Sequence, residues 1–525
     1  MQTLDPTGGT ESRCPTASTR PATQDKAAAQ ARQLAARYWF LPVLAGAGYR
    51  HSCFLYFIFD TGVAWCIVDR GDQQAAPVAV PLSRSLPFEA AAFDGVFACS
   101  TAGSAPALAG VVERLAHIVR PGGVLVCACP GLAGRLATAR LALAERDTAA
   151  MAPYFIATRT LYTLPGLRRP SLLLTSAELL GAGSTGELVT PHLSRPTRLL
   201  AQALARPSIV RRLSSRLVLW TRTARPLGEE HNSHGASQLH LSAAAPPWLA
   251  SDVDLALYTD KPRRAAQRAF AVIGAQKRSL AVVKFSREPD AKLAHEHWAL
   301  ARVHQLLASS PLRATIPAWW FRHTNVFAYE HRAGHSLQAL FSPLFRPPLQ
   351  LAEIRPLLQG ATDWLVAFQQ ATRLPSTAPA SGIPLGPVHG DFQPANILMQ
   401  SNGAVSVIDW EQFEERQPIT HDVLNLFTYV GLFYEPRRAL REACDRLFFV
   451  RTPLGELLRG VLQAYCRAMQ IPAGELRRAY DDFLAWRSRR RVAEGLTNEA
   501  HYLTGLSDFF ACNAAAATIF DLDRE

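Results

Sequence analysis

Continuous apolar runs, bounded by glycine, proline and polar residues, divide the first half of the chain into short elements. CFLYFIF at 53–59 and VAWCIV at 63–68 are rich in aromatic and β-branched residues, which is typical of buried strands. Residues 105–119 have helical apolar spacing, and RPGGVLVCACP at 120–130 predicts a Gly-Gly turn entering another buried strand. Strand, helix and strand in this order predict a parallel α/β sheet. A basic amphipathic helix near 196–219 is expected to close this half.

The second half begins with short strands. LALYT at 255–259, RAFAVIG at 268–274 and SLAVVKFSR at 279–287 each predict a strand, because their apolar runs are brief and bounded by turn-forming or charged residues. AKLAHEHWALARVHQLL at 291–307 has the apolar spacing of a helix, and NVFAYEH at 325–331 predicts one more strand. A small β-rich lobe with one prominent helix follows from this order.

A segment rich in small, polar and proline residues separates the two halves. ARPLGEEHNSHGASQLHLSAAAPP at 224–247 has the composition of a linker, and the pattern beyond residue 351 is mostly helical. We therefore predict a Rossmann-like α/β domain followed by an α+β domain with a small β-rich lobe and a larger helical lobe. The predicted ranges are a disordered or helical lead-in at 1–38, the α/β domain at 39–225, a linker at 226–250, and the second domain at 251–525, with its lobes at 251–337 and 338–525.

Composition narrows the class of protein. A chain of 525 residues with 48% hydrophobic and 19% charged residues is typical of a globular protein with two or three domains. The net charge is +12, but fifty of the 55 basic residues are arginines, which favours a biased composition over a nucleic-acid surface. Nine scattered cysteines without a CxxC pair indicate reduced thiols. The polar start lacks a signal-peptide core, and no apolar run is long enough to span a membrane, so we expect a cytoplasmic protein of open oligomeric state.

Three polar residues lie in a segment whose sequence has the pattern of a β-hairpin. It is PVHGDFQPANILMQSNGAVSVIDWEQF, at 387–413. NIL predicts a short strand, SNG a turn and AVSVIDW the returning strand, which puts Asp391 and Asn396 at the start of the hairpin and Asp409 at its end. Phosphoryl transfer needs one carboxylate to orient an acceptor hydroxyl, and oxygen ligands that hold Mg²⁺ on the phosphates. These three side chains supply that set.

The same residues carry a family resemblance. HGDFQPANIL followed by VIDWE resembles the catalytic loop and metal-binding segment of the aminoglycoside phosphotransferase and choline kinase group, small-molecule kinases with a protein-kinase-like fold. The resemblance implies that Asp391 is the catalytic base and that Asn396 and Asp409 bind Mg²⁺. The residues implied to shape or brace this loop are His389, Gly390 and Asp422.

The resemblance extends upstream and covers about 250–525. Lys284 ends the apolar strand AVVKF, and Glu296 lies twelve residues on in the predicted helix, as expected for the lysine that meets the α- and β-phosphates and its orienting glutamate. AYEHRAGHSL at 328–337 is similar to the hinge of the family, where backbone groups around Glu330 and His331 would meet the adenine. ATP and Mg²⁺ are therefore the implied cofactors, with GTP in place of ATP left open.

One segment departs from the family pattern. TDKPRRAAQRA, at 259–269, occupies the place of the phosphate-covering loop but contains no glycine. We expect Lys261, Arg263 and Arg264 to supply side-chain charge in place of close backbone contacts.

The first half resembles a different family. LPFEAAAFDGVFA at 86–98 and LAHIVRPGGVLV at 115–126 are similar to the fourth and fifth strand regions of class I S-adenosylmethionine-dependent methyltransferases. That family implies a glycine-rich turn and an acidic residue at the cofactor. LAGAGYR at 44–50 and Asp69 are the candidates, and both match the pattern poorly. We predict a degenerate methyltransferase-like domain, with S-adenosylmethionine binding left open.

The leading hypothesis is an ATP-dependent phosphotransferase that acts on a hydroxyl of a small polar molecule: a sugar, amino sugar, amino alcohol or natural product. Two alternatives stay open. One is a non-catalytic scaffold of a pseudokinase joined to a pseudo-methyltransferase, and the other is a bifunctional S-adenosylmethionine-dependent methyltransferase and kinase. The acceptor pocket is expected among the helices after residue 420, where the sequence does not identify the acceptor.

Overall fold

The computed structural model describes the helices and strands, and some of the segments between them. The described residues are 54–59, 63–69, 77–81, 88–100, 114–129, 155–164, 172–174, 215–222, 254–259, 268–275, 278–286, 290–323, 326–341, 349–373, 383–434, 450–495 and 497–512, with isolated positions in 28–38 and at 86, 442, 446 and 520. The chain forms two compact units: unit 1 contains 1–128, 138–157 and 219–244, and unit 2 contains 129–137, 158–218 and 245–525. Each unit is described separately.

Unit 1 contains a mixed sheet with a parallel centre. Its strands are β1 (Phe54–Phe59), β2 (Val63–Asp69), β3 (Val78–Pro81), β4 (Phe93–Ser100) and β5 (Val119–Cys129). β1 runs parallel to β4, and β4 runs parallel to β5, while β2 pairs antiparallel with β1 and with β3. The two strands predicted at 53–59 and 63–68 are confirmed, and so is a parallel pairing between the strands of this half. The methyltransferase-like character of the unit stays a prediction.

Aromatic packing explains why β1 and β4 lie together. Tyr56 of β1 and Phe97 of β4 are buried with ring centroids 6.0 Å apart, and Tyr38 stacks on Phe97 at 4.8 Å. A Cβ atom at Gly95 would lie 2.4 Å from the Phe54 ring, so the glycine lets these neighbouring strands approach.

Two predictions for this half are wrong in detail. The Gly-Gly pair, which was expected to form a turn before a strand, lies within β5 instead. At this point the register of β5 against β4 is irregular. Residues 215–219, expected in a basic helix, belong to the strand β8 (Ser215–Arg222), because LVLW at 217–220 is a short continuous apolar run, which favours a strand over a helix. The rest of that expected helix, residues 105–113 and the glycine-rich candidate at 44–50 lie outside the described residues. Asp69, the other candidate, is buried at the end of β2.

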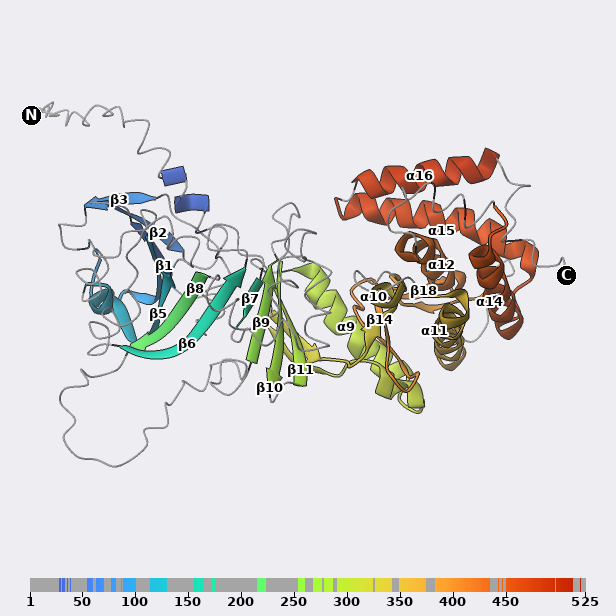
Figure 1. Cartoon of the computed structure of the whole chain (residues 1–525), viewed down its shortest axis with the longest axis horizontal. Helices are drawn as coiled ribbons and strands as arrows, with labels where there is room; N and C mark the ends of the chain where they lie inside the picture. Colours follow the sequence, from blue (N-terminus) through green and yellow to red (C-terminus); the bar gives the residue numbers. More distant parts are fainter. Residues whose placement is uncertain are drawn as a thin grey trace, which may run out of the picture. The chain divides into compact units, whose positions relative to one another are not determined.

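Unit 2 begins with an antiparallel sheet (Figure 1). Its strand order is β12-β13-β11-β10-β9-β7-β6. The strands are β6 (Phe155–Leu164), β7 (Leu172–Leu174), β9 (Asp254–Thr259), β10 (Arg268–Ala275), β11 (Arg278–Ser286), β12 (Trp319–His323) and β13 (Val326–Glu330). The three strands predicted at 255–287 and the strand at 325–331 are confirmed; β6, β7 and β12 were not predicted. The predicted linker at 226–250 lies outside the described residues, and the predicted domain limits stay predictions.

The helix α9 (Ala291–Leu306) follows β11 in the chain and precedes β12, as predicted for a helix at 291–307. Asp290 caps its start by accepting a hydrogen bond from the Lys292 backbone N–H at 2.8 Å. The buried face of α9 carries Leu293, Glu296 and Leu300, so a carboxylate lies on an otherwise apolar stripe. A buried carboxylate needs a cation nearby, and the site described below provides one.

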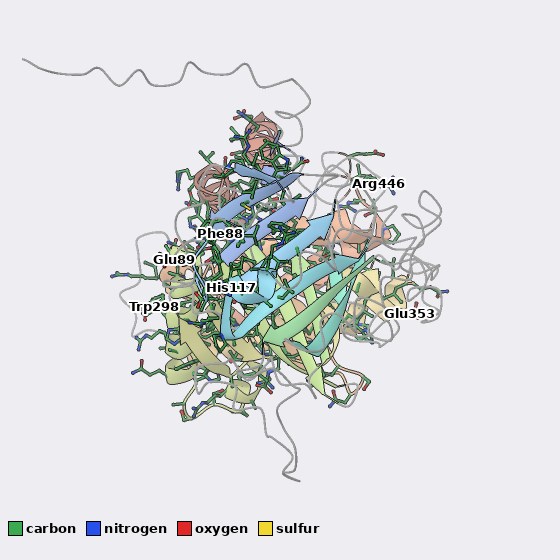
Figure 2. All side chains as sticks on the ribbon, turned by 90° about the vertical axis from the view of Figure 1, so that its left-hand side faces the viewer. Phe88, Glu89, His117, Trp298, Glu353 and Arg446 are labelled. Atoms are coloured by element: carbon green, nitrogen blue, oxygen red, sulfur yellow. The ribbon has the colours of Figure 1, made fainter. Side chains whose placement is uncertain are left out.

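The remainder of unit 2 is mostly helical, which confirms the prediction for the chain beyond residue 351. The helices are η4 (Pro311–Thr315), α10 (Leu337–Phe341), α11 (Leu351–Ala371), α12 (Thr420–Tyr434), α14 (Pro453–Met469), α15 (Ala473–Ala493) and α16 (Thr497–Cys512). Short strands connect them: β14 (His335–Ser336), β15 (Leu385–Val388), β16 (Ile397–Met399), β17 (Val405–Val407) and β18 (Glu414–Pro418). Polar side chains such as Glu353 of α11 lie at the surface (Figure 2). Among the described helices, none is long and apolar enough to cross a membrane.

Trp410 is at the centre of the core beneath the hairpin of β16 and β17. Its side chain is fully buried, its ring centroid lies 5.6 Å from that of Phe368 and 4.6 Å from that of His389, and its Nε1 donates to the Val407 carbonyl at 3.1 Å. The residue next to Asp409 therefore anchors this segment to the core through a large buried aromatic ring.

Replacing Trp410 with alanine tests this packing. We expect Trp410→Ala to lower the free energy of unfolding by about 3–5 kcal/mol, because a large cavity is left under the hairpin. Val492→Ala, at an exposed position of α15, is the control and should change it by less than about 0.5 kcal/mol. Urea unfolding followed by circular dichroism at 222 nm measures both, and equal destabilisation by the two substitutions would contradict the assignment of Trp410 to the core.

Candidate active site

The hairpin predicted from the sequence forms, and its register brings two of the predicted site residues together. Ile397 pairs with Val407 and Met399 with Val405, and the turn between the strands contains Gly403 at φ +82°. The hydrogen bonding between β16 and β17 extends one residue pair beyond the strands, because the Ile408 N–H donates to the Asn396 carbonyl at 3.0 Å. Asn396 thus lies directly beside the residue that precedes Asp409.

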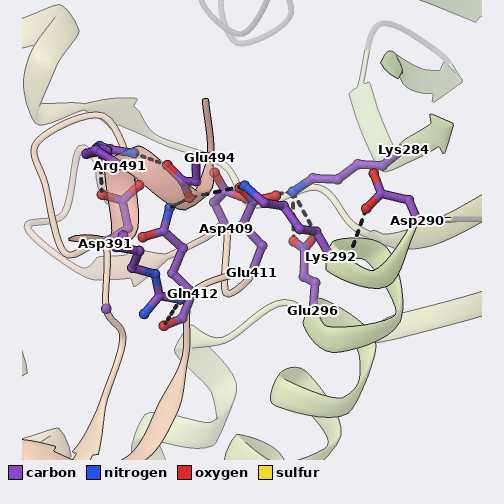
Figure 3. Close-up of polar contacts among 12 residues, drawn as sticks. Lys284, Asp290, Lys292, Glu296, Asp391, Asp409, Glu411, Gln412, Arg491 and Glu494 are labelled. Carbon is purple, nitrogen blue, oxygen red and sulfur yellow. Dashed lines mark hydrogen bonds and ion pairs between the residues drawn. The ribbon is translucent and has the colours of Figure 1, made fainter. Parts of the chain in front are cut away.

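Lys284 joins three elements of unit 2. Its side chain is only 3% exposed, and its Nζ lies 2.8 Å from both carboxylate oxygens of Glu296 on α9 and 2.6 Å from Oδ1 of Asp409. Burial alone would lower the pKa of Lys284, but the carboxylates of Asp409 and Glu296 outweigh it and hold the pKa well above its ordinary value. Lys284 is therefore a buried ammonium ion that contacts two carboxylates (Figure 3). The sequence predicted these three residues as parts of one site, and the structure brings them together.

Carboxylate oxygens gather around this ammonium. Oxygen atoms of Glu296, Asp409 and Glu411 lie within 4.8 Å of one another, and hard cations such as Mg²⁺ prefer such ligands. Burial raises the pKa of Glu296 to about 7, against the opposing effect of Lys284. Asp409 has a left-handed backbone at φ +66°, which is unusual for a residue other than glycine and often marks a functional position.

Asp391 lies in a second cluster and is only 6% exposed. Its Oδ2 accepts hydrogen bonds from Gln393 at 3.0 Å and Asn396 at 3.3 Å, while its Oδ1 pairs with Arg487 and lies 3.9 Å from Arg491. Burial would raise the pKa of Asp391, but the two guanidinium groups outweigh it and lower that pKa to about 2. Asp391 is therefore ionised throughout the physiological range. Both bonds of Asn396 to Asp391 use its amide nitrogen, so its amide oxygen takes no part in them.

The backbone before Asp391 is fixed from two sides. Both carboxylate oxygens of buried Asp422 accept backbone N–H groups, from His389 at 2.7 Å and from Gly390 at 3.0 Å. His389 accepts the Asp391 N–H on Nδ1 at 3.2 Å, so its Nε2 is the donor to the Ile408 carbonyl at 3.0 Å. Burial lowers the pKa of His389, in agreement with a neutral ring. The structure thus brings His389, Gly390 and Asp422 together next to Asp391, and their role in shaping or bracing a catalytic loop stays a prediction.

Sequence reasoning missed a set of polar residues around Asp391. Arg487 is fully buried; its Nη1 donates to Gln412 Oε1 at 2.9 Å, and its Nη2 donates to Asp391. Glu494, just beyond α15, accepts bonds from Arg491 at 2.7 Å, from Lys292 of α9 at 3.0 Å and from Gln412 at 2.9 Å (Figure 3). The end of α15 is thus bonded both to the segment around Asp391 and to α9.

The predicted adenine-binding residues lie at the end of β13. The Glu330 N–H donates to the Ala318 carbonyl at 2.7 Å, and its carboxylate pairs with Arg332 at 3.0 Å. Burial lowers the pKa of His331 to about 4, so its ring is neutral. The role of Glu330 and His331 at adenine stays a prediction. The basic segment at 261–264 lies outside the described residues.

Comparison with known proteins identifies one family. The profile of the phosphotransferase enzyme family matches residues 193–479. No curated protein matches the chain. The chain is similar to a solved complex of gentamicin with APH(2")-IIa, with 13% identity over 45% of this chain and 86% of the other and a TM-score of 0.29. Macrolide 2'-phosphotransferase MphH from Brachybacterium faecium gives 17% identity over 41% and 92%, with a TM-score of 0.22. Choline kinase LicA from Streptococcus pneumoniae gives 12% over 38% and 80%, with a TM-score of 0.20.

Gly390 offers a test of the backbone conformation next to Asp391. It has φ +78°, and a Cβ atom there would lie 2.0 Å from the Gln412 carbonyl oxygen, so Gly390→Ala must displace the loop. Gly403 has φ +82° but open space around it, which makes Gly403→Ala a matched control. We expect the control to lower the free energy of unfolding by about 1 kcal/mol and Gly390→Ala by about 3 kcal/mol or more. Denaturant unfolding measures both, and similar losses would show that the close approach at Gly390 is not present in solution.

Proposed function

Because the chain belongs to the phosphotransferase enzyme family, we propose that it transfers the γ-phosphate of ATP to a hydroxyl group of a small polar molecule. The observation that carries this proposal is the buried Lys284 ammonium, which Glu296 of α9 and Asp409 of the hairpin hold in one place. A lysine in this setting presents a localised positive charge to phosphate oxygens, and the glutamate fixes the orientation of the lysine side chain.

Lys284 would hold the phosphates of the nucleotide. Its bond to Asp409 joins a strand of the sheet to the hairpin, and an arriving polyphosphate would compete with Asp409 for the ammonium. The bond to Glu296 keeps Lys284 oriented during this exchange, because both carboxylate oxygens of Glu296 accept from it. Burial makes each of these charge interactions stronger than it would be in water.

Asp391 would orient the acceptor hydroxyl. With a pKa of about 2 it is a weak base, so its main contribution is to accept a hydrogen bond from the hydroxyl and take up the proton as transfer proceeds. This suits a loose phosphoryl-transfer transition state, in which little proton removal is needed before the new bond forms. Arg487 holds the carboxylate in place, and both side chains are almost completely buried.

The oxygen donors fit a magnesium ion. Asn396 and Asp409 would hold it, with Glu411 close to Asp409, and all three present the amide or carboxylate oxygens that Mg²⁺ prefers. When bound, the ion would neutralise charge that develops on the phosphates. No described residue supports an S-adenosylmethionine site, so the bifunctional hypothesis gains nothing from the structure.

Substitution of the two aspartates tests this function. We expect Asp391→Asn to retain Mg²⁺-dependent ATP binding but to lower ADP release in a pool of sugars and amino alcohols by about a hundredfold or more, since the oriented carboxylate is lost. Asp409→Asn should also weaken the Mg²⁺ dependence of ATP binding. Thermal shift and a coupled ADP assay report the two properties.

Asp363→Asn is the matched control, since Asp363 is an exposed residue of α11 that pairs only with Gln359 among the described contacts. It should leave both properties unchanged. Unaltered turnover in Asp391→Asn would defeat the mechanism, and absence of Mg²⁺-dependent ATP binding in the unmodified protein would favour the non-catalytic scaffold instead.

A further inference from the structure

Both oxygens of the Asp391 carboxylate already have partners. Oδ1 pairs with Arg487, and Oδ2 accepts hydrogen bonds from Nδ2 of Asn396 at 3.3 Å and from Nε2 of Gln393 at 3.0 Å. An acceptor hydroxyl that is to donate to this carboxylate needs room on one of the two oxygens. One of the present partners must therefore move, and the other bonds of each partner decide which one can.

Arg487 and Asn396 are held by additional bonds. Arg487 is fully buried and also donates to the Gly390 carbonyl at 3.0 Å and to Gln412 at 2.9 Å. Asn396 is only 6% exposed, and the same Nδ2 also donates to the Asp391 carbonyl at 2.9 Å. Moving either side chain would leave buried polar atoms without partners, which is costly. We therefore expect both to stay where they are when an acceptor binds.

Gln393 is held less firmly. Its side chain is half-buried, and among the described residues its only hydrogen-bond partner is Asp391. An ionised carboxylate accepts hydrogen bonds and cannot donate them, so the amide nitrogen is the atom that faces Asp391. The backbone of Gln393 is fixed separately, because its N–H donates to the Asp391 carbonyl at 2.8 Å and its carbonyl accepts the Asn396 N–H at 2.9 Å. The side chain can therefore rotate away from Asp391 without changing the turn.

The Gln393 amide and an acceptor hydroxyl are equivalent as donors to Asp391. Each is a neutral group that gives one hydrogen to a carboxylate oxygen, and 3.0 Å is an ordinary length for such a bond. The other side chains that contact this carboxylate among the described residues, Asn396, Arg487 and Arg491, are all buried. The side occupied by half-buried Gln393 is therefore the one from which an incoming molecule can reach Oδ2. Water would reach the same oxygen if the amide were absent.

We propose that Gln393 holds the acceptor position on Asp391: its amide keeps water from Oδ2 and moves aside for the acceptor hydroxyl. This inference rests on the proposed phosphotransferase function and adds a residue that selects between substrate and water as acceptors. In the hydrolysis that Gln393 suppresses, the oxygen of a water molecule bonds to the γ-phosphorus of ATP while the bond from that phosphorus to ADP breaks. One proton of the water passes to Asp391 and then to the solvent, and the products are ADP and inorganic phosphate.

Hydrolysis of ATP by the full chain, with Mg²⁺ and without any added acceptor, tests the inference. We expect Gln393→Ala to raise the rate of ADP release about tenfold or more, because water gains access to Oδ2 of Asp391. Gln393→Glu should raise the rate as well, because its carboxylate has a similar size but cannot donate a hydrogen bond to Asp391. A coupled ADP assay measures both rates. Damage to the fold would lower the rate, so an increase separates the proposed role from a merely structural one.

Two further variants assign the added hydrolysis to Asp391. In the double variant of Gln393→Ala with Asp391→Asn, the rate should fall to that of the unmodified protein or below, because the added hydrolysis needs the Asp391 carboxylate. Gln400→Ala is the matched control, since Gln400 is a half-buried glutamine of the same hairpin, directly after β16. It should leave the rate unchanged.

Two results would overturn the inference: a rate that rises in neither Gln393 variant, or a rise that persists in full in the double variant. Either result leaves the proposed phosphotransferase function in place, provided that the unmodified protein binds ATP in a Mg²⁺-dependent way. A protein that does not bind ATP with Mg²⁺ fails both proposals.

Discussion

The ammonium of Lys284 is the interaction on which the rest of the site depends. A charge that is 3% exposed is stable only when carboxylates surround it, and here they come from α9 and from the end of the β16–β17 hairpin. The sheet, α9 and the hairpin are therefore constrained to meet at one point. The carboxylates of Asp409 and Glu411 lie at the same point, so the pairing that stabilises the fold also assembles the proposed phosphate site.

A second buried ion pair repeats this arrangement at the acceptor end. Arg487 fixes Asp391 and keeps it ionised, and Glu494 ties the end of α15 to Lys292 of α9. Lys292 lies one helical turn before Glu296, so the two ion-pair clusters share the helix α9. Within unit 2, the proposed nucleotide and acceptor ends of the site are therefore joined through ion pairs on α9.

The sequence predicted those parts of the site whose spacing is local. Asp391, Asn396 and Asp409 lie on one hairpin, and Lys284 and Glu296 lie on a strand and the helix that follows it, so short-range patterns place them. Arg487 and Arg491 lie almost a hundred residues beyond Asp391 in an arginine-rich helix, where no periodicity separates a site residue from a solvated one. The predictions at β5 and β8 were wrong for a different reason. A Gly-Gly pair and a short apolar run fit more than one conformation, so the surrounding sheet decides which one forms.

A crystal structure of the full chain with Mg²⁺ and a non-hydrolysable ATP analogue tests the proposal that Lys284 and Asp409 form a nucleotide site. Lys284 should keep its bond to Glu296, exchange its 2.6 Å contact with Asp409 for the phosphates, and release Asp409 to join Asn396 on Mg²⁺. An analogue bound elsewhere, or bound here with the Lys284–Asp409 pair still intact, would contradict it.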